Sequence, residues 1–282
     1  MSLRPSRPAP NPRRPDRGPA PVLAAVGLGV FVLAFVGLVI GAQTLIHQGR
    51  PDDKTLCPAA GPSALTALLI DTTDPLNAIQ RAAVLARLNR IVSHLRLGEE
   101  IVVYSVNPTG DPLKAAFVIC RPIKPSEVSE LTGNRAIAQR RFDEAFAPRI
   151  RSVLTAATGA ASPSGRSPIM AAIQAIAVSA FQAADAASAS GGPPPKRLII
   201  VSDMLENSEA ANHYKGAPDF RSFKSTRGYA RVRSHLDGVT VTILYLRRDD
   251  AAAIQGLTHI RFWNEWFADQ GASVEDVAAI EG

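Results

Sequence analysis

The sequence predicts an α/β domain with a doubly wound, Rossmann-like sheet that contains one antiparallel strand and is preceded by one transmembrane helix. Three observations lead to this prediction. Residues 22–42 carry no charge. After residue 63, short apolar runs alternate with amphipathic stretches, as they do when helices connect parallel strands. Two of the apolar runs are separated only by Asn107 to Pro112, which is too short for a parallel crossover, so this pair is expected to be antiparallel.

The composition limits both the architecture and the function classes. With 282 residues, of which 46% are hydrophobic, the chain can hold one membrane segment and one globular domain of about 230 residues. The net charge of +6 is mostly local, because residues 1–21 contribute +4 through five Arg and one Asp, and residues 22–46 contribute none. The folded part is therefore not expected to bind nucleic acid on charge grounds. The sequence has no Walker A, HExxH or GxSxG pattern.

Residues 1–21 form an Arg/Pro-rich tail, which we expect to be disordered and cytoplasmic because this composition cannot form a core. Residues 22–46 are predicted to be a transmembrane signal anchor, since the uncharged stretch can span the roughly 30 Å core of a bilayer. A cleaved signal peptide is the alternative, but its apolar region is normally about 7–15 residues long. The positive-inside rule then sends the C-terminal domain across the membrane. Gly37 and Gly41 form a GxxxG pattern through which another helix can pack closely.

Residues 47–63 read as a linker rich in Pro, Gly and Asp, and residues 64–282 as the folded domain. Helices are expected to start at Asp74-Pro75 and at Ser167-Pro168, because each pair places a capping side chain before a proline at the first helical position. A long helix over Asn134–Thr158 and a terminal helix around Phe262–Phe267 complete the set, and no clear sixth strand follows Leu246. The five expected strands are Ala64–Asp71, Ile101–Val106, Leu113–Cys120, Arg197–Val201 and Val239–Leu246.

The two cysteines, Cys57 and Cys120, are too few and too far apart for a zinc ribbon or a redox CxxC motif. Cys57 lies near the start of the first strand, and Cys120 ends the antiparallel third strand, which returns to the same end of the sheet. We therefore expect a Cys57–Cys120 disulfide in an oxidising compartment. The alternative is two unpaired, buried thiols.

Asp71 and Asp203 both lie at the carboxyl ends of predicted strands, where doubly wound sheets bind ligands. The stretches around them and around Ser167 read LLIDTTDP, GRSPIMAAI and LIIVSDMLEN. In order and spacing they resemble the three motifs of von Willebrand factor type A domains, and the resemblance covers about residues 64–270. It implies a divalent-cation site for Mg²⁺ or Mn²⁺ with Asp71, Thr73, Ser167 and Asp203 as ligands.

Three departures from the family pattern weaken the implied metal site. Pro75 stands where the family has a second serine, which removes one oxygen ligand for a hard cation. Met204 follows Asp203 where the family often has Gly, and the family's sixth strand is not evident. Asp74 and Ser167 are also explained as helix caps, and Asp71 and Asp203 can hold loop amides instead of a metal.

A basic segment precedes the last predicted strand, and its charged residues are interleaved with aromatic ones. Such a segment can bind an anionic protein or envelope polymer, or it can be a solvated helix face; nucleic acid is not expected as a partner. The basic residues are Arg221, Lys224, Arg227, Arg231 and Arg233, and the aromatic ones are Phe220, Phe223 and Tyr229.

Together these features predict a single-pass protein of the bacterial inner membrane, with a cytoplasmic N-terminus and a periplasmic domain. The resemblance implies a protein–protein interaction module in an envelope assembly, with ligand binding that depends on a divalent cation. One alternative is a metal-free structural subunit of an envelope or secretion/transfer complex. A metal-dependent hydrolase is the weaker alternative, because no His or Lys accompanies Asp71 and Asp203 as a general base. We do not expect an enzyme.

Overall fold

The computed structural model describes residues 35–36, 51–106, 108, 113–129, 133–161, 163–187, 192–216 and 218–282. The chain divides into two compact units, residues 1–50 and residues 51–282. In the first unit only Phe35 and Val36 are described, and both are helical and exposed. The predicted tail and the rest of the predicted membrane segment, including Gly37 and Gly41, lie outside the described residues.

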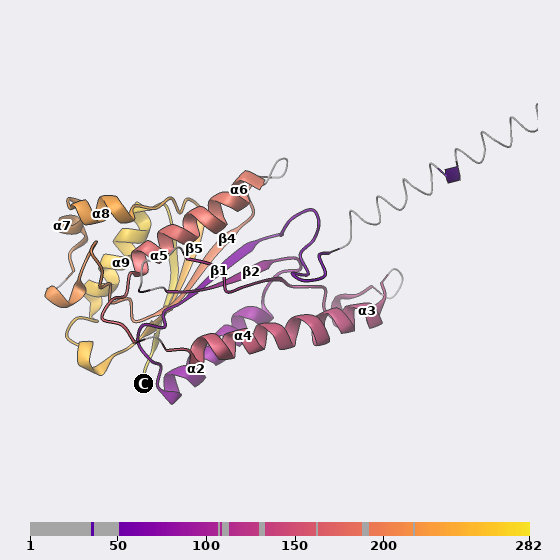
Figure 1. Ribbon diagram of the computed structural model, residues 1–282, viewed down its shortest axis with the longest axis horizontal. Helices are drawn as coiled ribbons and strands as arrows, with labels where there is room; N and C mark the ends of the chain where they lie inside the picture. Colours follow the sequence, from indigo (N-terminus) through magenta and orange to yellow (C-terminus); the bar gives the residue numbers. More distant parts are fainter. Residues whose placement is uncertain are drawn as a thin grey trace, which may run out of the picture. The chain divides into compact units, whose positions relative to one another are not determined.

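The second unit is an α/β domain built on a six-stranded sheet with the order β3-β2-β1-β4-β5-β6 (Figure 1). The edge strand β3 is antiparallel to β2, and the other neighbours are parallel. This confirms the predicted α/β class with one antiparallel pair. The strands are β1 (Leu65–Ile70), β2 (Glu100–Ser105), β3 (Phe117–Cys120), β4 (Lys196–Ser202), β5 (Val239–Leu246) and β6 (Ser273–Ile280).

Helices cover both faces of the sheet, as expected of a doubly wound fold (Figure 1). The α-helices of the described residues in the second unit are α2 (Ala78–Ser93), α3 (Arg135–Gln139), α4 (Ala147–Gly159), α5 (Ile169–Ile176), α6 (Ala183–Ala187), α7 (Phe220–Lys224), α8 (Arg227–Val232) and α9 (Leu257–Asp269). Two π-helical segments, η2 (Arg140–Phe146) and η3 (Ala177–Gln182), continue them, and three short 3₁₀ turns are η1 (Pro125–Glu127), η4 (His213–Lys215) and η5 (Asp249–Ala251).

The core consists of two layers, one on each face of the sheet. Strand β1 is buried on both faces, so its alternate side chains enter different layers. Leu65, Ala67 and Leu69 belong to the layer that contains α5 and α9, and Leu68 and Ile70 to the layer that contains α2 and α4. The near-continuous apolar run of β1 follows from this double burial.

Strand register brings the carboxyl ends of β1 and β4 to the same edge of the sheet. Ile70 pairs with Val201, and the backbone N–H of Asp71 donates to the carbonyl of Val201 at 2.8 Å. Asp71 directly follows β1 and Asp203 directly follows β4. The two carboxylates therefore lie on neighbouring chain segments at the end of the sheet that is opposite the start of β1.

The predicted start of α2 is wrong by several residues. The helix begins at Ala78, and its cap is Asn77, whose side chain accepts from the backbone N–H of Gln80 at 2.9 Å in a capping box. Asp74 and Pro75 lie in the loop before it, and both carbonyls accept hydrogen bonds from Arg248. The side chains that α2 buries are Gln80, Val84 and Leu88, whereas Ile79 in its first turn is 67% exposed.

The predicted helix over Asn134–Thr158 consists of α3, η2 and α4. Asn134 is its cap, with its side chain accepting from the backbone N–H of Ile137. The π-helical turn ends where the N–H of Ala147 bonds the carbonyl of Phe142, five residues back, just before Pro148. Since proline has no N–H to donate, it interrupts the regular i to i−4 ladder at this point.

Two strand predictions also differ from the structure. Strand β3 begins at Phe117 and not at Leu113, so it is shorter than its apolar run. A sixth strand, β6, does follow β5 and pairs with it in parallel. Its sequence was not recognised because β6 is an edge strand whose residues, among them Glu275 and Asp276, are largely exposed, which breaks the apolar pattern.

Within the described part of the chain, one helical stretch, Ile169–Ala186, is long and apolar enough to cross a membrane by length and composition. Ile169, Met170, Ile173 and Ile176 of this stretch are buried in the layer against the sheet. It is therefore a core helix of the domain. The predicted membrane segment at residues 22–46 is a separate stretch.

Candidate functional site

Asp71 is the centre of a hydrogen-bond cluster at the carboxyl end of the sheet. Its Oδ1 accepts from the backbone N–H of Thr73 at 3.0 Å and from the Thr73 hydroxyl at 2.6 Å. Its Oδ2 accepts from the hydroxyls of Ser167 at 3.0 Å and Ser202 at 2.9 Å. All four residues are buried. The structure thus brings together Asp71, Thr73 and Ser167, which the sequence predicted to share a site, and adds Ser202.

Ser167 is held in place by the loop that follows β4. Its backbone N–H donates to the carbonyl of Asn207 at 2.9 Å, and the N–H of Asn207 donates back to the carbonyl of Ser167 at 3.0 Å. Ser167 does not cap the following helix, as the sequence suggested. α5 begins at Ile169, and its first turn is capped from outside by Glu206, whose Oε2 accepts from the N–H of Met170 at 2.9 Å. Burial raises the pKa of Glu206 to about 7.

Asp203 forms an ion pair with Arg248, which was not among the predicted site residues. Its Oδ2 accepts from Nε of Arg248 at 3.1 Å, and its Oδ1 accepts from the N–H of Leu205 at 2.9 Å. The side chain of Asp203 is 4% exposed and that of Arg248 is 17% exposed. In the sequence Arg248 is the second residue of a basic pair directly after the apolar run of β5, a pattern that does not by itself indicate a contact with Asp203.

The Arg248 guanidinium also contacts the loop that follows β1. Its Nη1 donates to the carbonyl of Pro75 at 2.9 Å, and its Nη2 reaches the carbonyl of Asp74 at 3.5 Å. Arg248 therefore connects three chain segments, the loops after β1, β4 and β5. An arginine is suited to this because its planar guanidinium offers five N–H donors in fixed directions.

The carboxyl groups at this end of the sheet affect one another. Burial, and next to it the negative charge of Asp71, raise the pKa of Asp203 to about 7, while the Leu205 amide and the Arg248 charge act in the opposite direction. Burial also raises the pKa of Asp74. Strongly shifted carboxyl groups in one cluster are typical of functional sites, although ion-pair networks produce them as well.

Met204 has a backbone conformation that favours glycine. Its φ angle is 60°, in the left-handed region, at the position where the resembled family often has Gly. The turn is fixed from two sides: the Met204 N–H donates to the Ser202 hydroxyl at 2.8 Å, and its carbonyl accepts from the indole N–H of Trp263 at 2.9 Å. The backbone thus makes a sharp turn after Asp203, with a residue that is strained in it.

The residues as they are placed do not fit a hard divalent cation. Mg²⁺ takes oxygen ligands in near-octahedral geometry. Pro75 has no side-chain oxygen, and its carbonyl already accepts from Arg248. Both oxygens of Asp203 are engaged, and the positive guanidinium lies within the cluster. A dication at the Asp71–Asp203 end would have to displace this charge.

A cavity of about 280 Å³ adjoins Arg248 at the same end of the sheet. Its walls are polar and include both positively and negatively charged side chains, so the cavity does not favour one class of ligand. The residues that line it are Pro75, Asn77, Gln80, Arg247, Arg248, Asp249, Asp250 and Gly282.

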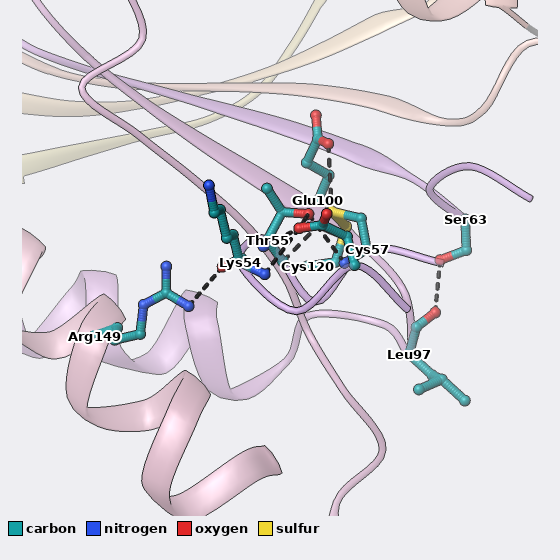
Figure 2. The surroundings of a disulfide bond; sticks show 9 residues. Lys54, Thr55, Cys57, Ser63, Leu97, Glu100, Cys120 and Arg149 are labelled. Carbon is teal, nitrogen blue, oxygen red and sulfur yellow. Dashed lines mark hydrogen bonds between the residues drawn. A yellow bond between two sulfur atoms is a disulfide. The ribbon is translucent and has the colours of Figure 1, made fainter. Parts of the chain in front are cut away.

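Cys57 and Cys120 form a disulfide at the opposite end of the sheet (Figure 2). Cys120 pairs with Glu100 across β3 and β2, and its N–H donates to the carbonyl of Thr55 at 2.7 Å. On the other side, Arg149 of α4 donates to the carbonyl of Lys54 at 2.6 Å. The end of the predicted linker is thus fixed to the amino end of the sheet.

The disulfide lies beside a half-buried carboxyl group. Oε2 of Glu100 is 3.6 Å from Sγ of Cys57, and burial raises the pKa of Glu100. The ligand atoms of Glu100 and the two cysteines lie within 4.8 Å of one another, which is a spacing suited to a metal ion. Because the two sulfurs are bonded to each other, they offer no thiolate to a metal in this state.

The basic segment forms α7 and α8, and its aromatic residues belong to the core. The rings of Phe220 and Phe223 pack on Phe262, with centroids 6.1 and 5.7 Å away. These rings are not free to stack on bases. Lys224 pairs with Asp269 and Arg231 with Glu209. The five predicted basic residues, Arg221, Lys224, Arg227, Arg231 and Arg233, are all exposed.

Two of the histidines, His213 and His259, meet in the core although they are far apart in the sequence. His213 Nδ1 lies 3.0 Å from His259 Nε2, and the hydroxyl of Tyr245 lies 2.6 Å from His259 Nδ1. Burial lowers the pKa of His213 to about 3 and that of His259 to about 4, so both are neutral. The two rings contact each other and Tyr245, and so they are not placed to act as a general base beside Asp71 or Asp203.

This chain matches no protein-family model and no curated protein. Its function is therefore inferred from the geometry of the domain.

Proposed function

We propose that this protein is a membrane-anchored interaction module of the von Willebrand factor type A kind, which binds a protein partner in a bacterial envelope assembly. The observation that carries the proposal is the convergence of Asp71, Ser167 and Asp203, from three separate segments, at the carboxyl end of a doubly wound sheet. This is the end at which such sheets bind ligands. The antiparallel edge strand β3 and the sixth strand β6 also support a fold of the von Willebrand factor type A kind.

The surface around this cluster suits a protein partner. Three large apolar side chains are exposed on segments that follow strands at the carboxyl end: Ile79 in the first turn of α2 is 67% exposed, Tyr214 in η4 is 52% exposed, and Leu257 at the start of α9 is 82% exposed. Exposed aromatic and aliphatic side chains of this kind can anchor a protein partner.

The geometry favours the metal-free form of this function over the cation-dependent form. The ion pair between Asp203 and Arg248 supplies a positive charge where the resemblance implied Mg²⁺ or Mn²⁺. We do not propose a hydrolase, because a base would be required beside Asp71 or Asp203. The two buried histidines among the described residues, His213 and His259, contact each other and Tyr245 instead.

We further propose that the domain lies in the periplasm and that residues 22–46 anchor it in the inner membrane. The Arg-rich tail and the uncharged stretch support this orientation. The disulfide supports an oxidising compartment. Within the domain, Asp71 and Asp203 lie at the carboxyl end of the sheet, and residues 54–57 are fixed to the opposite end.

The orientation is tested with reporter fusions after Gly282. A reporter enzyme that is active only outside the cytoplasm is expected to be active. Moving three or more Arg residues from the tail to positions after Ile46 is expected to reduce that activity, because positive charge sets the orientation. A cytoplasm-only reporter that is active at the same junction would overturn the proposed topology.

The partner surface is tested by photo-cross-linking in intact cells. A photoreactive phenylalanine derivative replaces Tyr214, which is exposed at the carboxyl end, and in a second strain it replaces Leu97, which is 51% exposed just before β2 at the amino end. We expect a covalent adduct with another protein at position 214 and a much weaker one at position 97, and mass spectrometry identifies the partner. Adducts at position 97 alone would show that the partner binds the other end.

A further inference from the structure

We propose that Arg248 supplies the positive charge of this site. Its guanidinium takes the place of a divalent ion and holds the carboxyl end of the sheet together without metal. The evidence is the placement of the guanidinium between Asp203 and the loop after β1. The inference concerns how this end of the sheet is held, and it does not depend on the identity of the partner proposed above.

Two buried carboxylates, Asp71 and Asp203, end neighbouring strands, and buried carboxylates require hydrogen bonds or positive charge. Asp71 obtains hydrogen bonds from hydroxyls and one amide. Asp203 obtains its positive charge from Arg248, and this is the one ion pair to Asp203 among the described residues.

A metal ion in such a site links loops that are distant in the sequence, and Arg248 makes the same kind of link. Its Nε contacts Asp203 after β4, and its Nη1 contacts the carbonyl of Pro75 after β1. The resemblance implies a serine hydroxyl ligand at position 75. Here the residue is Pro75, and its backbone carbonyl accepts a hydrogen bond from the guanidinium instead.

Gln255, which is 1% exposed, accepts from the N–H of Arg248 through Oε1 at 2.7 Å. Through Nε2 it donates to the carbonyls of Asp203 at 3.0 Å and Leu246 at 2.8 Å. One buried amide therefore fixes the backbone of both partners of the ion pair. An ion pair held in this way has a fixed geometry, whereas the side chains of an exposed surface ion pair are mobile.

The neighbouring Arg247 offers a matched control. Its Nη1 donates to the carbonyl of Gln255, and it makes no hydrogen bond or ion pair with Asp203. Replacing Arg247 removes the same formal charge from the same segment and leaves the Asp203–Arg248 pair in place. The two arginines thus separate a general effect of charge from the specific effect of the guanidinium at Asp203.

The test is thermal unfolding of the purified full-length chain in detergent, followed by tryptophan fluorescence with EDTA or with millimolar Mg²⁺. Both tryptophans, Trp263 and Trp266, lie in α9 of the domain, and Trp263 contacts the turn after Asp203. The wild type and R247A are expected to unfold at the same temperature in both buffers. R248A is expected to gain about 3–6 °C from Mg²⁺ at about ten times its Kd, because the vacated cluster can then bind the ion. D203N in the R248A background is expected to abolish this gain.

R248A can lose its fold when Asp203 is left unpaired, so its recovery of a folded fluorescence spectrum on addition of Mg²⁺ counts as the same positive result. R248K keeps a positive charge and is expected to show no Mg²⁺ response. The proposal is overturned if Mg²⁺ stabilises the wild type, or if R248A responds to Mg²⁺ no more than R247A does. Because no partner takes part in this measurement, it stands apart from the cross-linking result.

Discussion

Replacing both Cys57 and Cys120 with Ser is expected to lower the free energy of unfolding of the domain by about 4 kcal/mol. The disulfide joins residues 63 positions apart, and closing a loop of that length restricts the unfolded chain by about this amount on the chain-entropy model. For a domain of this size the unfolding temperature should fall by about 10 °C or more. The bridge also fixes residues 54–57 to the sheet, so its loss frees this segment.

The measurement is thermal unfolding of the full-length protein with and without a thiol reductant. Reductant should shift the wild type to the unfolding temperature of the double variant and should leave the double variant unchanged. Protein alkylated during extraction should yield a Cys57–Cys120 linked peptide that disappears on reduction. If both thiols are labelled quantitatively without reductant, or if reductant leaves the unfolding temperature unchanged, the prediction is wrong.

The sequence predicted the strands well where burial on both faces produces continuous apolar runs, as in β1 and β5. Chain direction then followed from connection length, which placed Cys120 at the same end as Cys57. Strand β6 was missed because an edge strand with one solvated side carries Glu275 and Asp276 and loses the apolar signal. The start of α2 was misplaced because Asp74-Pro75 has the same form as a capping pair, whereas Asn77 with Gln80 forms the actual capping box.

Part of the candidate site was predictable for a similar reason. A carboxylate directly after a buried strand lies at the carboxyl end of the sheet, so Asp71 and Asp203 could be placed together from sequence alone. Arg248 could not be selected, because an arginine after a strand is normally solvated and only the three-dimensional arrangement of the loops brings it to Asp203. Local propensity gave Ser167 a helix-capping role, while tertiary contacts with Asn207 and Asp71 hold it elsewhere.

Asp71→Ala is expected to lower the free energy of unfolding by about 3 kcal/mol. The carboxylate accepts four hydrogen bonds from Thr73, Ser167 and Ser202, and removing it leaves these buried donors without their acceptor. Hydrogen bonds to a charged group contribute about 1.5–3 kcal/mol each, but hydroxyls can turn to other acceptors, so the sum overstates the loss. Removing Asp71 also relieves its repulsion of Asp203, which offsets part of the cost.

Asp71→Asn is the matched control, and it separates the hydrogen bonds from the charge. One oxygen remains to accept from the N–H and hydroxyl of Thr73, and the new amide can donate to the hydroxyl oxygens of Ser167 and Ser202. We therefore expect a loss of only about 1 kcal/mol, measured by urea unfolding of the full-length chain at neutral pH. The pKa of Asp203 should fall in both variants, because the charge of Asp71 is among the causes that raise it. If the alanine and asparagine variants unfold at the same urea concentration as the wild type, the cluster around Asp71 does not hold the end of the sheet together.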